Sequence, residues 1–140
     1  MFETILILNA VWFGLGFHLF AIRTKVFAKI LVPKEERHTP VYDMFAWTGK
    51  FMGGFNFSFC ILSVLLVLNT DFFPDARQRI ILLVVFATAH GSQFLGNVPV
   101  ALDNRKGKGV WQVKGLMLFI FVTDLILTIL NLVAAGMYAF

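Results

Sequence analysis

The sequence predicts an all-α integral membrane protein: an antiparallel four-helix bundle whose first loop is amphipathic and cytoplasmic. Hydrophobic residues make up 59% of the 140 residues, whereas charged residues make up only 14%. A mean hydropathy of +0.80 leaves too little polar surface for a soluble domain of this size. The apolar residues also gather into four runs, each close to the ~20 residues that cross ~30 Å of hydrocarbon as a helix.

The four predicted spans cover approximately residues 4–22, 45–69, 80–102 and 115–140. They are apolar on all sides, unlike the helices of a soluble core, whose apolar residues follow a 3.6-residue period. No long linker, low-complexity segment or internal repeat divides the chain, so residues 1–140 are expected to form a single transmembrane domain. Because the second loop is short, we expect the second and third spans to be antiparallel neighbours.

The first loop, residues 23–44, contains a short amphipathic stretch. Apolar residues recur there at helical spacing among lysines, which predicts an interfacial helix or a cytoplasmic extension of the first span. These apolar residues are Val26, Phe27, Ile30 and Leu31. Pro33 is expected to end the helix, and the polar residues up to Pro40 predict a turn exposed to water.

The lysines and arginines between the spans predict the orientation, because these residues accumulate on the cytoplasmic side. The second loop contains only Arg77 and Arg79, whereas the first and third loops contain nine, namely Arg23, Lys25, Lys29, Lys34, Arg37, Arg105, Lys106, Lys108 and Lys114. We therefore expect loops 23–44 and 103–114 in the cytoplasm and both termini outside, with a bacterial inner membrane as the expected location. The basic loops favour anionic lipid headgroups as partners, and nothing predicts nucleic-acid binding.

Seven amide or ionisable side chains lie in the cytoplasmic half of the predicted spans or at the midplane. Such residues ask for an explanation, because a charged group at a helix centre costs ~2.5 to 3.5 kcal/mol on insertion scales. Counting ~1.5 Å per residue from the cytoplasmic ends places a shallow layer roughly 6 to 8 Å deep and a second layer ~13 to 18 Å deep. The shallow layer holds His18, Lys50 and Asn97, and the deeper layer holds Gln93, Asp124, Asn56 and His90. We expect a polar pocket that opens toward the cytoplasm.

Helical spacing groups some of these residues on shared faces. His90, Gln93 and Asn97 follow an i, i+3, i+7 pattern, which places them on one face of the third span. On the fourth span, Asp124 shares a face with Thr128 and Asn131 in the same way. Apart from Asn131 and Asn9, the outer half of the bundle is expected to be apolar.

Small residues predict where the helices approach one another. Gly49 and Gly53 form a GxxxG pair in the second span, and such pairs permit close helix contact. Ala87 and Gly91 give the third span a similar seam.

Each polar residue also has a purely structural interpretation. Amide side chains commonly hydrogen-bond between helices without any function, and the shallow His18 and Lys50 can reach water. Asp124 and His90 are too deep for that, which favours a functional or tightly paired role. We hypothesise that Asp124 pairs with His90 or Lys50, because an opposite charge allows a carboxylate to stay ionised in a low dielectric.

No cofactor is predicted. Two intramembrane histidines raise the alternative of a b-type haem, but axial ligands must meet at one depth, and His18 lies much shallower than His90. No metal site is predicted either, because a catalytic zinc ion needs about three protein ligands, and His90, Asp124 and His18 do not converge. Cys60 is the only cysteine, so the chain offers no thiolate cluster and no internal disulfide.

The layout carries one resemblance. The chain has a histidine in the first span, a basic amphipathic first loop, a second span with glycine and asparagine, and a polar third span. The residues that carry this layout are Gly14, His18, Gly53, Gly54, Asn56 and Gly91. In this layout the chain resembles several families of small four-span bacterial integral membrane proteins without assigned function. The resemblance implies a four-span membrane protein and carries over no catalytic or binding residue.

These observations favour binding of a small amphipathic or lipid-like molecule in the cytoplasm-facing pocket, with phenylalanines as apolar walls. The predicted ligand-binding residues are His90, Asp124, Gln93, Asn56, Asn97, Lys50 and His18, and the predicted helix-packing residues are Gly49, Gly53, Ala87 and Gly91. A structural or accessory subunit of a larger membrane complex is the first alternative. The protein partners considered are further copies of this chain, as a homo-oligomer, or the other chains of such a complex.

An intramembrane lipid-modifying enzyme, with Asp124 and His90 as acid and base, is the second alternative. Only Ser92 and Thr123 offer hydroxyls beside these residues, and as sequence neighbours they point elsewhere, which disfavours an enzyme. The sequence leaves the question of enzymatic activity open.

Overall fold

The computed structural model describes residues 1–109 and 111–139, and within these ranges all regular secondary structure is helical. The elements in chain order are α1 (Phe2–Phe17), a π-helical turn (His18–Ile22), α2 (Thr24–Leu31), a 3₁₀ turn (Lys34–Glu36), α3 (Pro40–Leu68), a second 3₁₀ turn (Thr70–Phe72), α4 (Ala76–Arg105) and α5 (Leu116–Ala139). Four of the described helices are long and apolar enough to cross a membrane. The predicted helical bundle is therefore confirmed, and its composition indicates a membrane protein.

The helices extend beyond the predicted apolar runs. α3 begins at Pro40, which occupies the first turn, where its missing N–H costs no hydrogen bond. α4 begins after Asp75, whose carboxylate accepts a hydrogen bond from the Arg77 backbone N–H at 2.7 Å, and it continues through Pro99. These ends are polar, so a hydropathy pattern does not include them.

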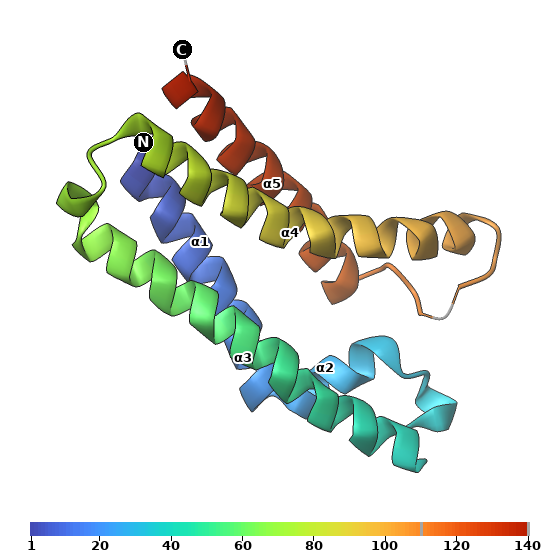
Figure 1. Cartoon of the computed structure of the whole chain (residues 1–140). Coiled ribbons are helices and arrows are strands. Elements are labelled where there is room, and N and C mark those ends of the chain that lie inside the picture. The colour runs from blue at the N-terminus through green and yellow to red at the C-terminus, as the bar shows by residue number, and fades with distance from the viewer. Residues whose placement is uncertain (110, 140) are drawn as a thin grey trace.

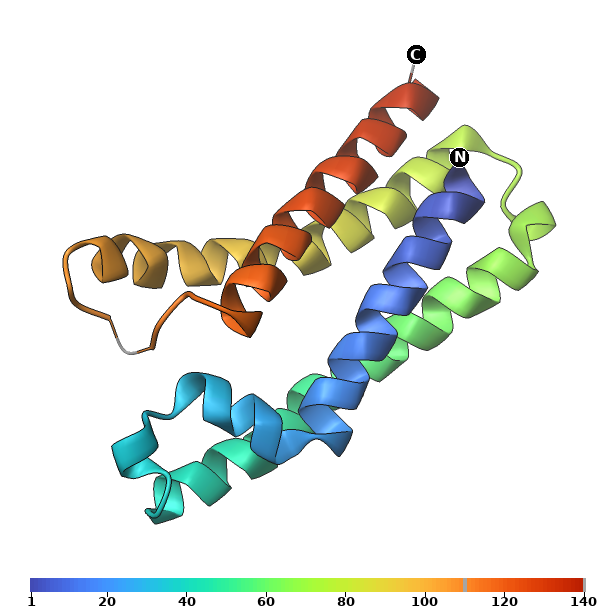
Figure 2. The same ribbon diagram turned by 180° about the vertical axis from the view of Figure 1, so that it is seen from behind.

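The four long helices form two hairpins that diverge from one end (Figure 1). α1 packs along α3, and α4 packs along α5. The prediction that the second and third spans are neighbours is wrong over most of their length, because α3 and α4 separate after the turn that joins them and make few contacts. The rear view shows the same V shape, closed near the two termini and open near α2 and the loop after α4 (Figure 2).

The closed end contains the main apolar core. Its buried members come from all four long helices and include Phe2, Leu6, Phe13, Leu66, Leu83, Phe86 and Ala134. Arg79 packs over this end of the core. Its guanidinium carbon lies 5.3 Å from the ring centre of Phe2 and 5.6 Å from that of Tyr138. Its Nε donates to the Phe73 carbonyl. The core therefore holds the hairpins together at one end only.

The small-residue seam of α3 receives the π-helical turn. A Cβ on Gly53 would lie 2.7 Å from the Ala21 nitrogen, and one on Gly49 would lie 2.9 Å from the Phe20 oxygen. The π turn is closed by the Arg23 N–H, which donates to the His18 carbonyl at 2.8 Å. Such a turn is wider than an α-helical turn, and the glycines leave room for its backbone.

At Ala87 and Gly91, the contact between α4 and α5 is less close than the contact at Gly49 and Gly53 of α3. Ala87 is buried, and a Cβ on Gly91 would lie 3.4 Å from the Thr128 methyl carbon, which is ordinary contact. The seam in α3 is therefore the tighter of the two.

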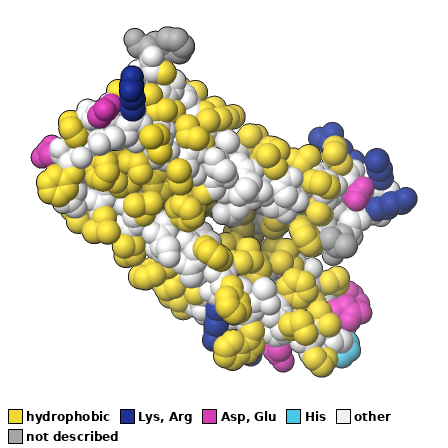
Figure 3. Space-filling view, in the orientation of Figure 1, with side chains coloured by type: hydrophobic (Ala, Val, Ile, Leu, Met, Phe, Trp, Pro, Cys, Tyr) yellow, Lys and Arg dark blue, Asp and Glu magenta, His cyan; other side chains and the backbone are white. Residues whose placement is uncertain are grey.

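Many large apolar side chains are exposed on the outside of the bundle, and Figure 3 shows those on one face. Phe51 and Phe55 on α3 are 76% and 72% exposed, and Leu95 on α4 is 65% exposed. An apolar belt of this extent is unfavourable in water and suits contact with lipid.

We predict that Gly53→Ala destabilises the protein by about 1–3 kcal/mol, because the added methyl group overpacks against the Ala21 backbone. The measurement is the thermal unfolding midpoint in a mild detergent. Gly54→Ala is the matched control, since a Cβ at Gly54 meets no atom within 4 Å. Equal midpoints for the two variants would contradict the tight seam.

Candidate functional site

A cluster of buried polar side chains lies where the two hairpins meet. Asn9 of α1, His90 of α4, and Asp124 and Asn131 of α5 are all 0% exposed. The indole of Trp12, one turn after Asn9, joins them. Each residue is on an apolar helix, so burying these groups is favourable only because they bind one another.

The cluster is connected by short side-chain contacts that cross between hairpins. Trp12 Nε1 donates to Asp124 Oδ1 at 2.8 Å, and His90 Nδ1 lies 3.3 Å from the same oxygen. The other ring nitrogen, Nε2, lies 2.9 Å from Asn9 Oδ1. Asn9 and Asn131 exchange two amide hydrogen bonds of 3.0 and 3.1 Å.

A backbone carbonyl fixes the proton on His90. A backbone carbonyl can only accept a hydrogen bond, so the Asn131 atom that lies 2.8 Å from the Leu127 carbonyl must be the donor Nδ2. The other atom of that amide, Asn131 Oδ1, then accepts a hydrogen bond from Asn9 Nδ2. Asn9 therefore turns its carbonyl oxygen toward His90. An oxygen without a proton faces Nε2, so Nε2 carries the hydrogen.

The contact between His90 Nδ1 and Asp124 Oδ1 then requires one shared proton. With Nε2 protonated, either Nδ1 is also protonated and faces a carboxylate, or Asp124 is a neutral acid that donates to Nδ1. Both arrangements leave the pair with no net charge. A neutral pair avoids most of the cost of an isolated charge in hydrocarbon.

Aromatic rings shield this pair from solvent. The Phe13 ring stacks on His90 at a centroid distance of 4.5 Å. The second carboxylate oxygen of Asp124, Oδ2, is buried and has no hydrogen-bond partner among the described residues. Asp124 Oδ2 is therefore an acceptor that no described residue uses.

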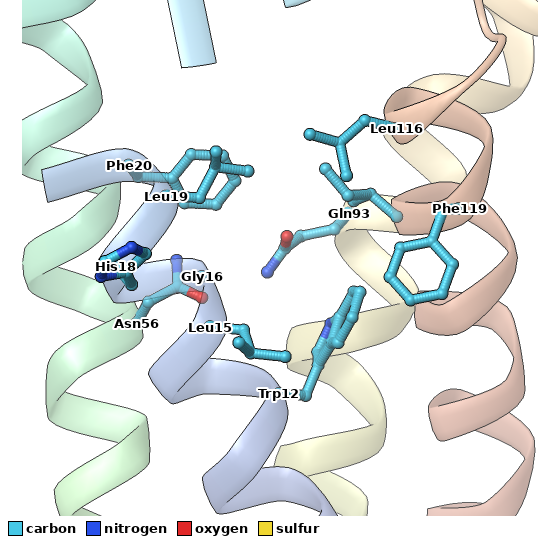
Figure 4. A pocket seen from close by; sticks show the side chains of 11 residues that line it. Trp12, Leu15, Gly16, His18, Leu19, Phe20, Asn56, Gln93, Leu116 and Phe119 are labelled. Carbon is cyan, nitrogen blue, oxygen red and sulfur yellow. The ribbon is translucent and has the colours of Figure 1, made fainter. Parts of the chain in front are cut away.

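A cavity of about 220 Å³ lies on the open side of the cluster, between α1, α4 and α5. Trp12 separates it from Asp124, so one indole contacts both the buried pair and the cavity. The walls are mainly apolar, and polar groups enter from three helices, with His18, Asn56 and Gln93 among the lining residues. Figure 4 shows the Gln93 amide pointing into the space between α1 and α5.

Gln93 also lines two neighbouring cavities. One of about 330 Å³ extends toward the open end and includes Asn97, and one of about 440 Å³ lies between α1, α3 and α4. Asn97 and Asn56 each donate to a backbone carbonyl one turn earlier on their own helix, Gln93 and Met52 respectively. Their amides are thus partly occupied within their helices.

The predicted site residues therefore fall into three groups. Asp124 and His90 contact each other, and His18, Asn56, Gln93 and Asn97 line the cavities on the open side. The expectation that Lys50 lies beside Asp124 is corrected, because Lys50 is exposed and its Nζ lies 3.7 Å from the centre of the Trp47 ring. Its helix turns it outward, and the long side chain finds an aromatic partner there.

The geometry gives no position for an axial haem ligand at His90, since Asp124 and Asn9 occupy both of its ring nitrogens. His18 is exposed. Within residues 1–109 and 111–139, no three His, Cys, Asp or Glu side chains converge into a metal-binding group.

Trp12, Asn9 and Asn131 belong to the cluster but were not predicted as site residues. The depth count placed the two asparagines in the apolar outer half and did not pair them across helices. Trp12 carries the clearer signal, because an indole N–H within a span must find an acceptor. Its acceptor, Asp124, is 112 positions away.

Comparisons with known proteins assign no family: no family model, no curated protein and no solved structure matches the chain. The resemblance to small four-span families remains a similarity of layout. The site geometry therefore carries the functional argument.

We predict that Asp124→Asn and His90→Gln are coupled, by about 1 kcal/mol in the free energy of unfolding, because each side chain binds the other. Denaturant titration of the two single variants and the double variant measures the coupling. Asp124→Asn with Lys50→Met is the control and should be additive within about 0.5 kcal/mol. Plain additivity for His90 and Asp124 would rule out the pair.

Proposed function

We propose that this protein binds a small amphipathic or lipid-like molecule in the cavity between α1, α4 and α5. The observation that carries the proposal is the cavity's composition: its walls are mainly apolar, and Trp12, His18, Asn56 and Gln93 are among the residues that line it. Small-molecule sites typically have this character, with a few placed polar groups that orient the ligand.

The size of the cavity supports a ligand with an extended apolar part. At about 220 Å³ it is smaller than the ~300–1,000 Å³ of typical ligand pockets. It shares Phe20, Gln93 and Ile120 with the neighbouring cavity of about 330 Å³, and the two together fall within that range. A ligand that fills both would extend from the buried cluster toward the open end.

The alternative of a complex subunit depended on a free GxxxG seam in α3. The GxxxG seam of α3 is occupied by the π turn of the same chain, at Phe20 and Ala21, and is not free for another helix. The alternative of an enzyme keeps Asp124 and His90, but both are 0% exposed and bound to each other. Ligand binding therefore remains the better-supported function.

We further infer that the open end faces the cytoplasm of a bacterial inner membrane and that both termini are outside. The basic first and third loops lie at the open end, and basic loops accumulate on the cytoplasmic side. With this orientation the ligand would enter from the cytoplasmic side, where anionic headgroups are abundant.

We predict that native mass spectrometry of the protein, extracted in a mild detergent from its own membrane, detects one discrete small-molecule adduct. Gln93→Trp should abolish the adduct, because a bulky ring at Gln93 fills the point where the cavities meet. Leu95→Trp is the matched control on the same helix, since Leu95 is exposed and outside these cavities.

A wild-type protein without any adduct, bound stoichiometrically to other chains, would contradict the binding function and favour the subunit alternative. An adduct that persists in Gln93→Trp would place the ligand elsewhere.

The orientation predicts which loops a membrane-impermeant thiol reagent reaches in intact cells. In a Cys60→Ser background, Asp71→Cys in the second loop should be labelled from outside, whereas Glu36→Cys and Asp103→Cys should be labelled only after the cells are opened. All three positions are exposed, so burial does not explain a difference. The reverse pattern would invert the topology.

A further inference from the structure

A fourth cavity, of about 550 Å³, lies at the open end between the two arms of the V. One wall comes from α2 and the turn after it, and the other from the loop between α4 and α5. Figure 2 shows these two segments facing each other across the open end. The cavity therefore lies between residues that are distant in sequence.

The charge of this cavity is positive. Lys29 and Arg37 line it from one arm, and Lys114 lines it from the other. No aspartate or glutamate is among the described residues that line it. The arrangement favours an anion, because unopposed cations in a partly enclosed space attract negative charge.

Two further features suit a bound anion. The indole nitrogen of Trp111, which can only donate, is buried without a hydrogen-bond partner among the described residues. Trp111 lines this cavity and the neighbouring one of about 330 Å³, and its nitrogen is a donor still available to an acceptor. Arg37 is held in place because its Nη2 donates to the Lys29 carbonyl at 2.8 Å and its Nε to the Val32 carbonyl at 3.1 Å.

The loop that carries Trp111 and Lys114 is organised by one side chain. Asn104 Nδ2 donates to the carbonyls of Lys108 and Trp111, and its Oδ1 accepts from the Val113 N–H at 2.7 Å. Gly109 has a φ of +116°, a conformation that favours glycine, and a Cβ there would collide with the Asn104 amide. Asn104 thus holds the backbone of the segment that carries Trp111.

The basic cavity adjoins the apolar ones. It shares Ile30, Leu31, Trp111 and Met117 with the cavity of about 330 Å³, which in turn shares Gln93 with the innermost cavity. A molecule that lies along this path meets cations first and apolar walls further in. The innermost cavity of about 220 Å³ has room for the end of one chain rather than for a bulky group.

We propose that the ligand is a single-chain acyl anion of the long-chain carboxylate type. Its headgroup binds Lys29, Lys114 and the Trp111 N–H, and its chain runs inward past Gln93. This assignment rests on the proposed binding function and adds the charge and the chain number of the ligand.

The test is a native mass spectrometry titration of the full-length protein in a neutral detergent at neutral pH. Palmitate is the anionic probe, and hexadecanol, with the same chain length and no charge, is the neutral probe. Lys29→Gln/Lys114→Gln should raise the apparent Kd for palmitate about tenfold or more, because charge-assisted hydrogen bonds are lost. The Kd for hexadecanol should not change.

Two variants separate this site from general charge and folding effects. Lys106→Gln/Lys108→Gln removes two charges from the same loop, but at exposed positions outside the cavity, and should leave palmitate binding unchanged. Trp111→Phe keeps an aromatic ring and removes the N–H, so it should weaken palmitate binding severalfold and hexadecanol binding little.

The remaining outcomes are also decisive. Equal binding of palmitate and hexadecanol, unaffected by Lys29→Gln/Lys114→Gln, would overturn the anionic headgroup and leave the binding function intact. Binding of neither probe, in a protein that also shows no native adduct, would overturn both. Phosphatidylglycerol is the two-chain competitor. If it occupied the site at a lower concentration than palmitate does and displaced palmitate, the cavity would be assigned to a two-chain phospholipid and the single-chain assignment would be overturned.

Discussion

The contact between His90 and Asp124, extended by Trp12, Asn9 and Asn131, is the constraint on which the arrangement of the two hairpins depends. These five residues come from α1, α4 and α5, so their hydrogen bonds tie one hairpin to the other. In hydrocarbon, apolar side chains gain little by choosing a protein neighbour over lipid. A polar group gains more, because without its partner it remains unsatisfied.

The position of this cluster explains the shape of the molecule. Toward the termini, the apolar core continues from Phe13 and Phe86 to Phe2 and Tyr138, and the helices stay packed. Toward the other end, comparable packing between the hairpins gives way to cavities around Gln93. Among the described residues, the apolar core that joins the hairpins lies on one side of the cluster, and the hairpins diverge on the other side. The fold thus produces a cleft that is apolar near the cluster and basic at its mouth.

The glycine seam has a consequence for the cavity as well as for packing. Gly49 and Gly53 allow the π-helical turn to lie against α3, and that turn contributes His18, Leu19 and Phe20 to the cavity wall. π-helical turns are uncommon and are often found near functional sites. Here the turn carries His18 to the edge of the cavity, while α3 holds its backbone in place.

The sequence by itself determined the helical class, the four long apolar segments, the amphipathic α2 and the buried position of His90 and Asp124, because these follow from composition, periodicity and depth within the spans. Only the tertiary structure decided that α1 pairs with α3 and α4 with α5, that Lys50 faces outward, and that Trp12 and Asn9 complete the cluster. Those facts depend on how helices rotate and meet. A contact such as that between Trp12 and Asp124, 112 positions apart, leaves no periodic trace in either helix.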